Sequence, residues 1–163
     1  DLIIIPSLSH NYEDAIRGNE PLIYWLNEQY KSGTEIASIC TGAFLLASTG
    51  VLDGKSCSTH WAAAENFKKM FPRIDLQQDQ LITDENGIYT SGGAYSSLNL
   101  NLYLIEKYAG RELAVLSSKI FELDISRAAQ SPCIMFKGQN SHEDKEILDV
   151  QMYLEKISLQ LFA

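Results

Sequence analysis

The chain lacks long apolar runs. No stretch of its 163 residues approaches the ~20 consecutive apolar residues that a membrane-spanning helix needs. The apolar run at residues 2–5 is too short for a signal peptide, follows no basic leader and stops at Pro6, so it indicates a buried strand. These absences predict a cytoplasmic protein with no membrane partner.

Cysteine is scarce and carries no metal-binding spacing. Cys40, Cys57 and Cys133 are odd in number and show neither a C-x-x-C motif nor a histidine-paired zinc pattern. We therefore expect reduced thiols, no disulfide framework and no structural metal. The glycine pair at 92–93 belongs to neither a G-x-G-x-x-G motif nor a P-loop, so no nucleotide cofactor is expected.

Positive charge is also in deficit. Thirteen basic residues face twenty-one acidic ones, which gives a net charge of −8 and repels a phosphate backbone. This segment alone is therefore not expected to bind DNA. The length suits one domain, and 45% hydrophobic residues are ordinary for a globular protein with a real core.

Strand-like and helical runs alternate along the chain, which predicts an α/β fold with a mostly parallel sheet and helices on both faces. Strands are expected at residues 2–5, 35–39, 80–83 and 88–91, the last two flanking a hairpin turn at Glu85-Asn86-Gly87. Helices are expected at residues 19–31, 43–48, 61–71, 97–109 and 112–123. The helix at 97–109 is apolar nearly all round, so we expect it to be buried on more than one side.

The turn at Cys40-Thr41-Gly42 falls between a predicted strand and a predicted helix. A cysteine after a strand is more often a small buried apolar residue than a nucleophile. A helix N-terminus, however, favours the thiolate and directs backbone N–H groups at a bound anion. The turn is therefore suited to a carboxylate or an oxyanion.

Two further segments complete the predicted site. His60 precedes the helix expected at 61–71, where it either has a structural role or pairs with Cys40 across neighbouring turns. Ser91, Gly92 and Gly93 form another strand-to-helix turn, whose glycines permit close backbone approach. The ligand-binding residues are thus predicted to be Cys40, Thr41, Gly42, His60, Ser91, Gly92 and Gly93. In an enzyme, Cys40 would be the nucleophile and His60 the acid or base.

Several of these motifs resemble a known superfamily. Residues 36–47, residues 50–55 and Thr59-His60-Trp61 are similar to the nucleophile-elbow region of the ThiJ/PfpI (class I glutamine amidotransferase-like) domains. They are most similar to the branch fused to AraC-type DNA-binding domains, as are the later landmarks at 89–93 and 127–130. The resemblance implies a flavodoxin-like, doubly wound sheet and a sensor for a small nitrogenous metabolite. It also implies a homodimer that binds DNA only through a helix-turn-helix domain absent from this chain.

The same resemblance suggests domain boundaries. Residues 1–137 are expected to form the sensor domain, without the first strand and helix of the family pattern. Residues 138–163 are expected to form a linker helix toward the helix-turn-helix domain. An apolar stripe runs along that helix at Ile147, Val150, Leu154, Ile157 and Leu161, and it suits docking on its own domain, a dimer seam or a linker equally well.

The sequence departs from the enzymes of the superfamily in ways that favour binding over catalysis. Ser7 and Leu8 follow Pro6, where the enzymes have glycines that help to form an oxyanion hole. The acidic partner of the cysteine cannot be assigned. We therefore predict a non-catalytic sensor. The alternatives are a cysteine-dependent hydrolase or hydratase of the isonitrile-hydratase or amidase type, and an inert dimerisation module.

Overall fold

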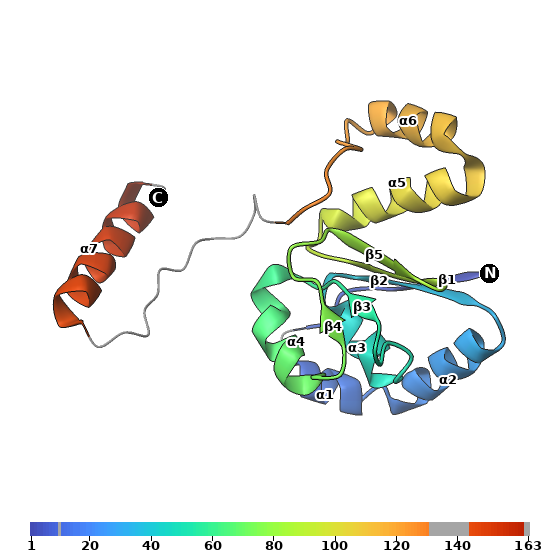
Figure 1. Ribbon diagram of the computed structural model, residues 1–163, viewed down its shortest axis with the longest axis horizontal. Coiled ribbons are helices and arrows are strands. Elements are labelled where there is room, and N and C mark those ends of the chain that lie inside the picture. The colour runs from blue at the N-terminus through green and yellow to red at the C-terminus, as the bar shows by residue number, and fades with distance from the viewer. Residues whose placement is uncertain (10, 131–143, 162–163) are drawn as a thin grey trace. The chain divides into compact units, whose positions relative to one another are not determined.

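The computed structural model describes residues 1–9, 11–130 and 144–161 (Figure 1). The chain divides into two compact units, Asp1–Cys133 and Ile134–Ala163. The first contains the sheet and six helices of the described residues, and the second contains helix α7 (Lys145–Leu161). Cys133 and residues 138–143 of the expected linker helix lie outside the described residues.

A four-stranded sheet forms the centre of the first unit. Its strand order is β1 (Leu2–Ile5), β2 (Glu35–Ile39), β6 (Ile88–Ser91) and β5 (Ile82–Glu85). The first three strands are parallel and β5 is antiparallel to β6, which confirms the predicted mostly parallel sheet. A second sheet that was not predicted pairs two very short parallel strands, β3 (Ser56–Cys57) and β4 (Asp75–Leu76).

The hairpin between β5 and β6 is tighter than predicted. Asn86 and Gly87 have φ angles of 52° and 82°, so these two residues alone make the turn, as a two-residue hairpin of this kind requires. Glu85 consequently pairs directly with Ile88. The prediction of a strand at 80–83 was therefore wrong by two residues.

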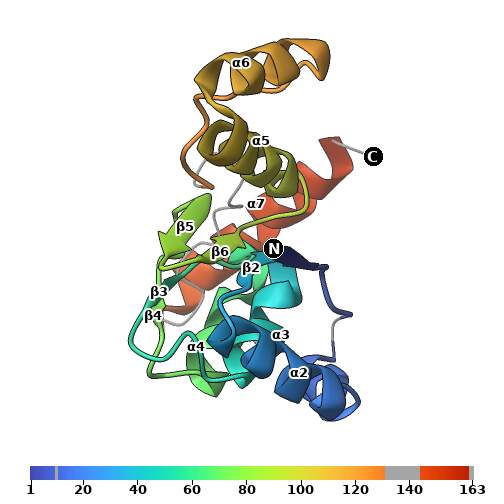
Figure 2. The same ribbon diagram turned by 90° about the vertical axis from the view of Figure 1, so that its right-hand side faces the viewer.

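Helices cover both faces of the sheet, as predicted (Figures 1 and 2). One face carries α1 (Tyr12–Arg17), α2 (Glu20–Lys31), α3 (Ala43–Ser48) and α4 (Ala64–Met70). The other carries α5 (Ser96–Ala109), and α6 (Arg111–Ile120) packs against α5 on the side away from the sheet (Figure 1). Helix α1 was not predicted, and the helix expected at 61–71 begins as a short 3-10 turn, η2 (Trp61–Ala63). Helix α6 ends three residues before its predicted end, with Phe121 as its C-cap.

The two faces of β2 build two separate cores. Ile36 packs among the helices on the α3 face, in a cluster that includes Phe44 and Phe67. The next residue, Ala37, points to the other face because side chains alternate along a strand, and there it meets Leu100 and Leu104 of α5. Helix α5 contacts β6 on one side and α6 on another, which confirms its predicted burial on more than one side.

Within the described residues, no helix combines the length and the apolar composition that a membrane span requires.

Truncation of Leu100 tests this packing. Leu100 has no exposed surface, so Leu100→Ala should lower the free energy of unfolding by about 2–5 kcal/mol through lost burial and a residual cavity. The matched control is Leu116→Ala on α6, where the side chain is 53% exposed and the loss should stay below about 1 kcal/mol. Urea denaturation measures both. Equal losses would show that α5 is not the buried layer of this face.

Candidate functional site

The predicted site residues gather at one edge of the sheet. Strands β2 and β6 are parallel neighbours, and Ile39 at the end of β2 pairs with Ser91 at the end of β6. Because the carboxyl ends of parallel strands meet at the same edge, the turn at Cys40 and the turn at Ser91–Gly93 are adjacent. Helices α3 and α5 begin shortly after these two turns.

Cys40 occupies a strained position between β2 and α3. It starts the 3-10 turn η1 (Cys40–Gly42) with a φ of 57°, a left-handed conformation that is uncommon for a residue with a side chain. Its backbone oxygen accepts a hydrogen bond from the hydroxyl of Thr59 at 2.9 Å, which fixes the turn from behind. Only 8% of Cys40 is exposed.

The other two residues of the turn bind the loop that follows β1. The Thr41 hydroxyl accepts a hydrogen bond from the Leu8 backbone N–H at 2.9 Å and donates one to the Leu8 carbonyl at 3.0 Å. A Cβ atom on Gly42 would lie 2.5 Å from the Pro6 carbonyl oxygen and 2.9 Å from that of Ile5. Gly42 is therefore sterically required, and the Thr41 hydroxyl is engaged within the protein.

Burial governs the ionisation of Cys40. Loss of hydration raises the pKa of the thiol, and hydrogen bonds from the backbone and side chain of Thr41 oppose this with a smaller effect. The thiol is therefore favoured over the expected thiolate. The pKa of Tyr12 is also raised, first by burial and then by the nearby Cys40. Tyr12 stacks on Phe44 with the ring centroids 4.0 Å apart, and no sequence pattern indicates that Tyr12 lies near Cys40.

His60 caps the 3-10 turn η2. Its Nδ1 accepts a hydrogen bond from the Ala62 backbone N–H at 3.1 Å, so the neutral ring carries its proton on Nε2. Burial lowers the pKa of His60, which favours this neutral form. Among the described residues, no hydrogen bond joins the ring to the Cys40 thiol. The ring edge instead faces Gly93, where a Cβ atom would lie 3.4 Å from Cδ2.

The turn at Ser91–Gly93 is largely buried and its backbone is engaged within the protein. Ser91 and Gly92 are buried, and the Gly92 N–H donates to the Leu81 carbonyl at 2.9 Å, so it is not free to hold a ligand. The side chain of Gln130 covers Gly92 so closely that a Cβ atom there would lie 2.2 Å from Gln130 Cδ. Gln130 had been noted as part of a family landmark, but no local signal in the sequence indicated that it reaches the site.

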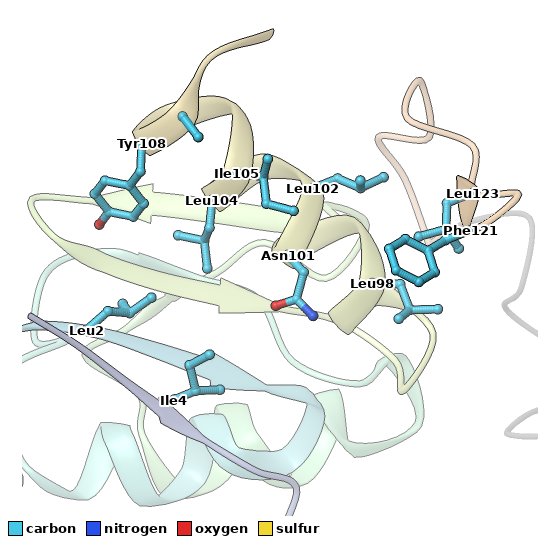
Figure 3. A pocket seen from close by; sticks show the side chains of 11 residues that line it. Leu2, Ile4, Leu98, Asn101, Leu102, Leu104, Ile105, Tyr108, Phe121 and Leu123 are labelled. Atoms are coloured by element: carbon cyan, nitrogen blue, oxygen red, sulfur yellow. The ribbon is translucent and has the colours of Figure 1, made fainter. Parts of the chain in front are cut away.

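A pocket lies away from these residues in the first unit. It has a volume of about 660 Å³ and lies between β1 and α5 (Figure 3). Leu2, Ile4, Leu104 and Tyr108 contribute to its mostly apolar lining, and none of the seven predicted site residues does. Within the described ranges, no group of three or more histidine, cysteine or acidic side chains is placed to hold a metal ion.

Alanine substitution tests whether Gly42 is sterically required, with Gly93 as the comparison. Gly42→Ala should lower the free energy of unfolding by about 1–3 kcal/mol or more, because the added carbon meets backbone atoms that cannot move alone. Gly93→Ala is the matched control, since the added carbon would make an ordinary contact of 3.4 Å with His60 and little stability should be lost. Thermal unfolding measures both, and similar losses would contradict the close approach of β1 to the turn.

The ionisation of Cys40 predicts how its reactivity varies with pH. Because burial raises the pKa of the thiol above its ordinary 9.0, the rate of alkylation by iodoacetamide should still be rising at pH 9.0. Peptide mass spectrometry resolves Cys40 from Cys57, whose pKa burial raises to about 12 and which should label more slowly. A plateau in the Cys40 rate at neutral pH would show instead that the thiolate is stabilised.

Comparisons with known proteins agree with this arrangement. The sequence profile of the DJ-1/PfpI family matches residues 1–107. The HTH-type transcriptional regulator GbdR of Pseudomonas aeruginosa is 31% identical over 130 residues, which cover 77% of this chain and 35% of that protein. The HTH-type transcriptional regulator CdhR of the same species is 35% identical over 123 residues, covering 71% of this chain and 36% of that protein. The chain thus spans about a third of the length of these two regulators.

The fold also matches a solved structure of the family. The crystal structure of Drosophila melanogaster DJ-1beta superposes with a TM-score of 0.64 at 22% sequence identity, covering 76% of this chain and 64% of that one. This likeness concerns the fold, and it confirms the predicted flavodoxin-like α/β architecture. Together with the family profile over residues 1–107, it confirms the resemblance found in the sequence: the chain belongs to the DJ-1/PfpI family.

Proposed function

We propose that the first unit is the ligand-sensing part of an AraC-type transcriptional regulator and that it acts without catalysis. The two regulators that share a third of their length with this chain support the regulatory assignment. The proposed ligand is a small nitrogenous metabolite, such as an amino acid or a quaternary amine, bound beside Cys40, Thr41, His60 and Gly93. DNA would then be contacted by a separate helix-turn-helix domain in the cytoplasm, because a net charge of −8 disfavours DNA binding by this segment.

The state of the cysteine and the histidine is the observation that carries this proposal. A nucleophilic cysteine needs a thiolate or a base that takes its proton. Here burial favours the neutral thiol, and the His60 nitrogen that accepts a hydrogen bond already receives one from Ala62. The neutral ring therefore offers a donor at Nε2 instead of a base. A neutral thiol and a histidine that donates from Nε2 can both bind a ligand. Neither is in the state that nucleophilic attack on a substrate requires.

The second unit supports a proposal about assembly. In α7, the side chains of Ile147, Val150 and Leu154 are exposed and recur at spacings of three and four residues. This is the pattern of a helix that pairs with another through an apolar seam. We propose that residues 138–163 act as a linker helix and pair with the same helix of a second copy in a homodimer.

The edge of the sheet bears on the proposed domain boundaries. Strand β1 pairs with β2 on one side, and Ile4 is exposed beside the apolar pocket of Figure 3. An apolar surface of this kind is costly to leave in water. The exposed surface therefore supports the proposal that residues 1–137 are part of a sensor domain of the family pattern. In that pattern a further strand and helix would cover this face.

A thermal-shift screen with the common amino acids and choline-like quaternary amines tests the proposed function. A ligand at about 100 times its dissociation constant should stabilise the fold by ~2.7 kcal/mol and so raise the melting temperature. Gly93→Val should abolish this rise, because its side chain would fill the space in front of His60. Ala94→Val is the matched control, since Ala94 is exposed in the same turn and the rise should persist.

Two outcomes would overturn the proposal. If no compound of the panel raises the melting temperature, the inert dimerisation module is favoured. If a compound is instead consumed, and Cys40→Ser abolishes that turnover while Cys57→Ser does not, the protein is a cysteine-dependent enzyme.

A further inference from the structure

A chain of buried polar groups lies directly behind Cys40. The Thr59 hydroxyl donates to the Cys40 carbonyl at 2.9 Å. The neighbouring Ser58 donates its backbone N–H to the Thr90 hydroxyl at 2.6 Å, and that hydroxyl also bonds the hydroxyl of Thr83 at 2.6 Å. Each of these side chains is at most 5% exposed. Buried polar groups of this kind are strongly constrained, because each one must find its partner inside the protein.

Gln130 is the side chain that joins this network to a distant part of the chain. Its amide nitrogen lies 3.0 Å from the Thr59 carbonyl, 3.1 Å from that of Gln80 and 3.2 Å from that of Gln78. The Ser58 hydroxyl oxygen is also within 3.3 Å. The residue is 1% exposed, although a glutamine is seldom fully buried. The two hydrogens of one NH₂ group therefore lie among four acceptors, three of which are backbone carbonyls.

The other end of the same amide lies against the second turn of the site. Gln130 Oε1 would be 2.3 Å from a Cβ atom on Gly92, so only glycine admits the side chain here. This oxygen is buried and has no hydrogen-bond partner. Gln130 thus bonds Ser58 and Thr59 through its nitrogen, while the whole amide group lies against the Gly92 turn. These are the two segments that flank the Cys40 turn.

The backbone around Gln130 is fixed at the same place. The Gln130 N–H donates to the Asp79 carbonyl at 2.8 Å, and the Leu81 N–H donates to the Ala128 carbonyl at 3.0 Å. Ala129 forms an isolated antiparallel bridge with Gln80. The segment at 128–130 is therefore held against residues 79–81, and its one long polar side chain enters the network behind the site.

We propose that Gln130 is a positioning residue of the Cys40 site, holding the Ser58–His60 segment and the Gly92 turn in the arrangement that encloses the cysteine. One side chain then fixes both the site and the segment at 128–130, which leads in sequence toward α7. A change at the site would be transmitted to that segment through the bonds of the amide. The transmission of a change to the segment at 128–130 rests on the proposed sensor function, whereas the positioning role of Gln130 does not.

Alkylation of cysteines tests the positioning role without any ligand. In Gln130→Ala, the Thr59 and Gln78 carbonyls lose the amide donor, whereas the Gln80 carbonyl keeps the Ser58 hydroxyl. The segments beside Cys40 should therefore open more often. The iodoacetamide rate at Cys40, followed by peptide mass spectrometry, should rise by about tenfold, while that at Cys57 should change less than about twofold. Cys57 is fully buried and reports general unfolding in the same sample.

Thr49→Val is the matched control. It removes a buried hydroxyl that bonds the Leu46 carbonyl at the end of α3, away from the network, so the ratio of the Cys40 and Cys57 rates should stay as in the unchanged protein. If Gln130→Ala raises both rates together, or neither, Gln130 only supports the fold and the proposal is wrong.

The isosteric variant Gln130→Glu adds a pH test that a cavity effect would not reproduce. Above its pKa the new carboxylate carries no hydrogen to donate and faces carbonyl oxygens, which repel it. The alkylation rate of Cys40 should then be higher than in the unchanged protein. Burial raises the pKa of such a group, and protonation at lower pH restores one O–H donor. The excess rate should therefore shrink as pH falls from 8 to about 5. A constant excess over this range would overturn the proposal, whatever the ligand screen shows.

Discussion

The carbonyl oxygens of Ile5 and Pro6 lie where only a hydrogen atom fits beside Gly42. This close approach sets the path of the chain through the Cys40 turn, because the turn must pass the end of β1 without a side chain at position 42. The Thr41 hydroxyl then bonds both backbone groups of Leu8, which ties the loop after β1 to the same turn. The location of Cys40, its left-handed backbone and its low exposure all depend on this contact between adjacent strand ends.

The parts of the fold that the sequence predicted correctly are those with a long or dense apolar pattern. The strands at 2–5 and 35–39 come from short, mostly apolar runs, and α5 carries four leucines in alternation. The burial predicted for residues 2–5 was wrong, because β1 lies at the edge of the described sheet and Ile4 is exposed. Helix α1 has six residues and no buried side chain, so it shows no helical period. The strands β3 and β4 have two residues each and arise from tertiary pairing alone. Such elements leave no pattern that a sequence can show.

The site was predictable in its position but not in its contacts. The change from strand to helix places Cys40 at the edge of the sheet. The orientation of His60, in contrast, follows from a bond to the Ala62 N–H, which exists only once η2 has formed. Gln130 is separated from Thr59 by 71 residues, and its burial depends on the bridge between Ala129 and Gln80. Contacts of that sequence separation depend on the folded topology and have no local signature.

The donors around Cys40 support the proposal that this site binds a ligand without catalysing acyl transfer. An oxyanion is stabilised by N–H groups that are free and already directed at it. Here the Leu8 N–H is taken by the Thr41 hydroxyl, and the Gly92 N–H is taken by the Leu81 carbonyl. The Thr41 N–H is directed at the Cys40 thiol, where it lowers the pKa less than burial raises it. Because these N–H groups are engaged inside the protein, they would poorly stabilise a negative charge that develops on a substrate during acyl transfer. The binding of a ligand develops no such charge and does not need free N–H groups at this place.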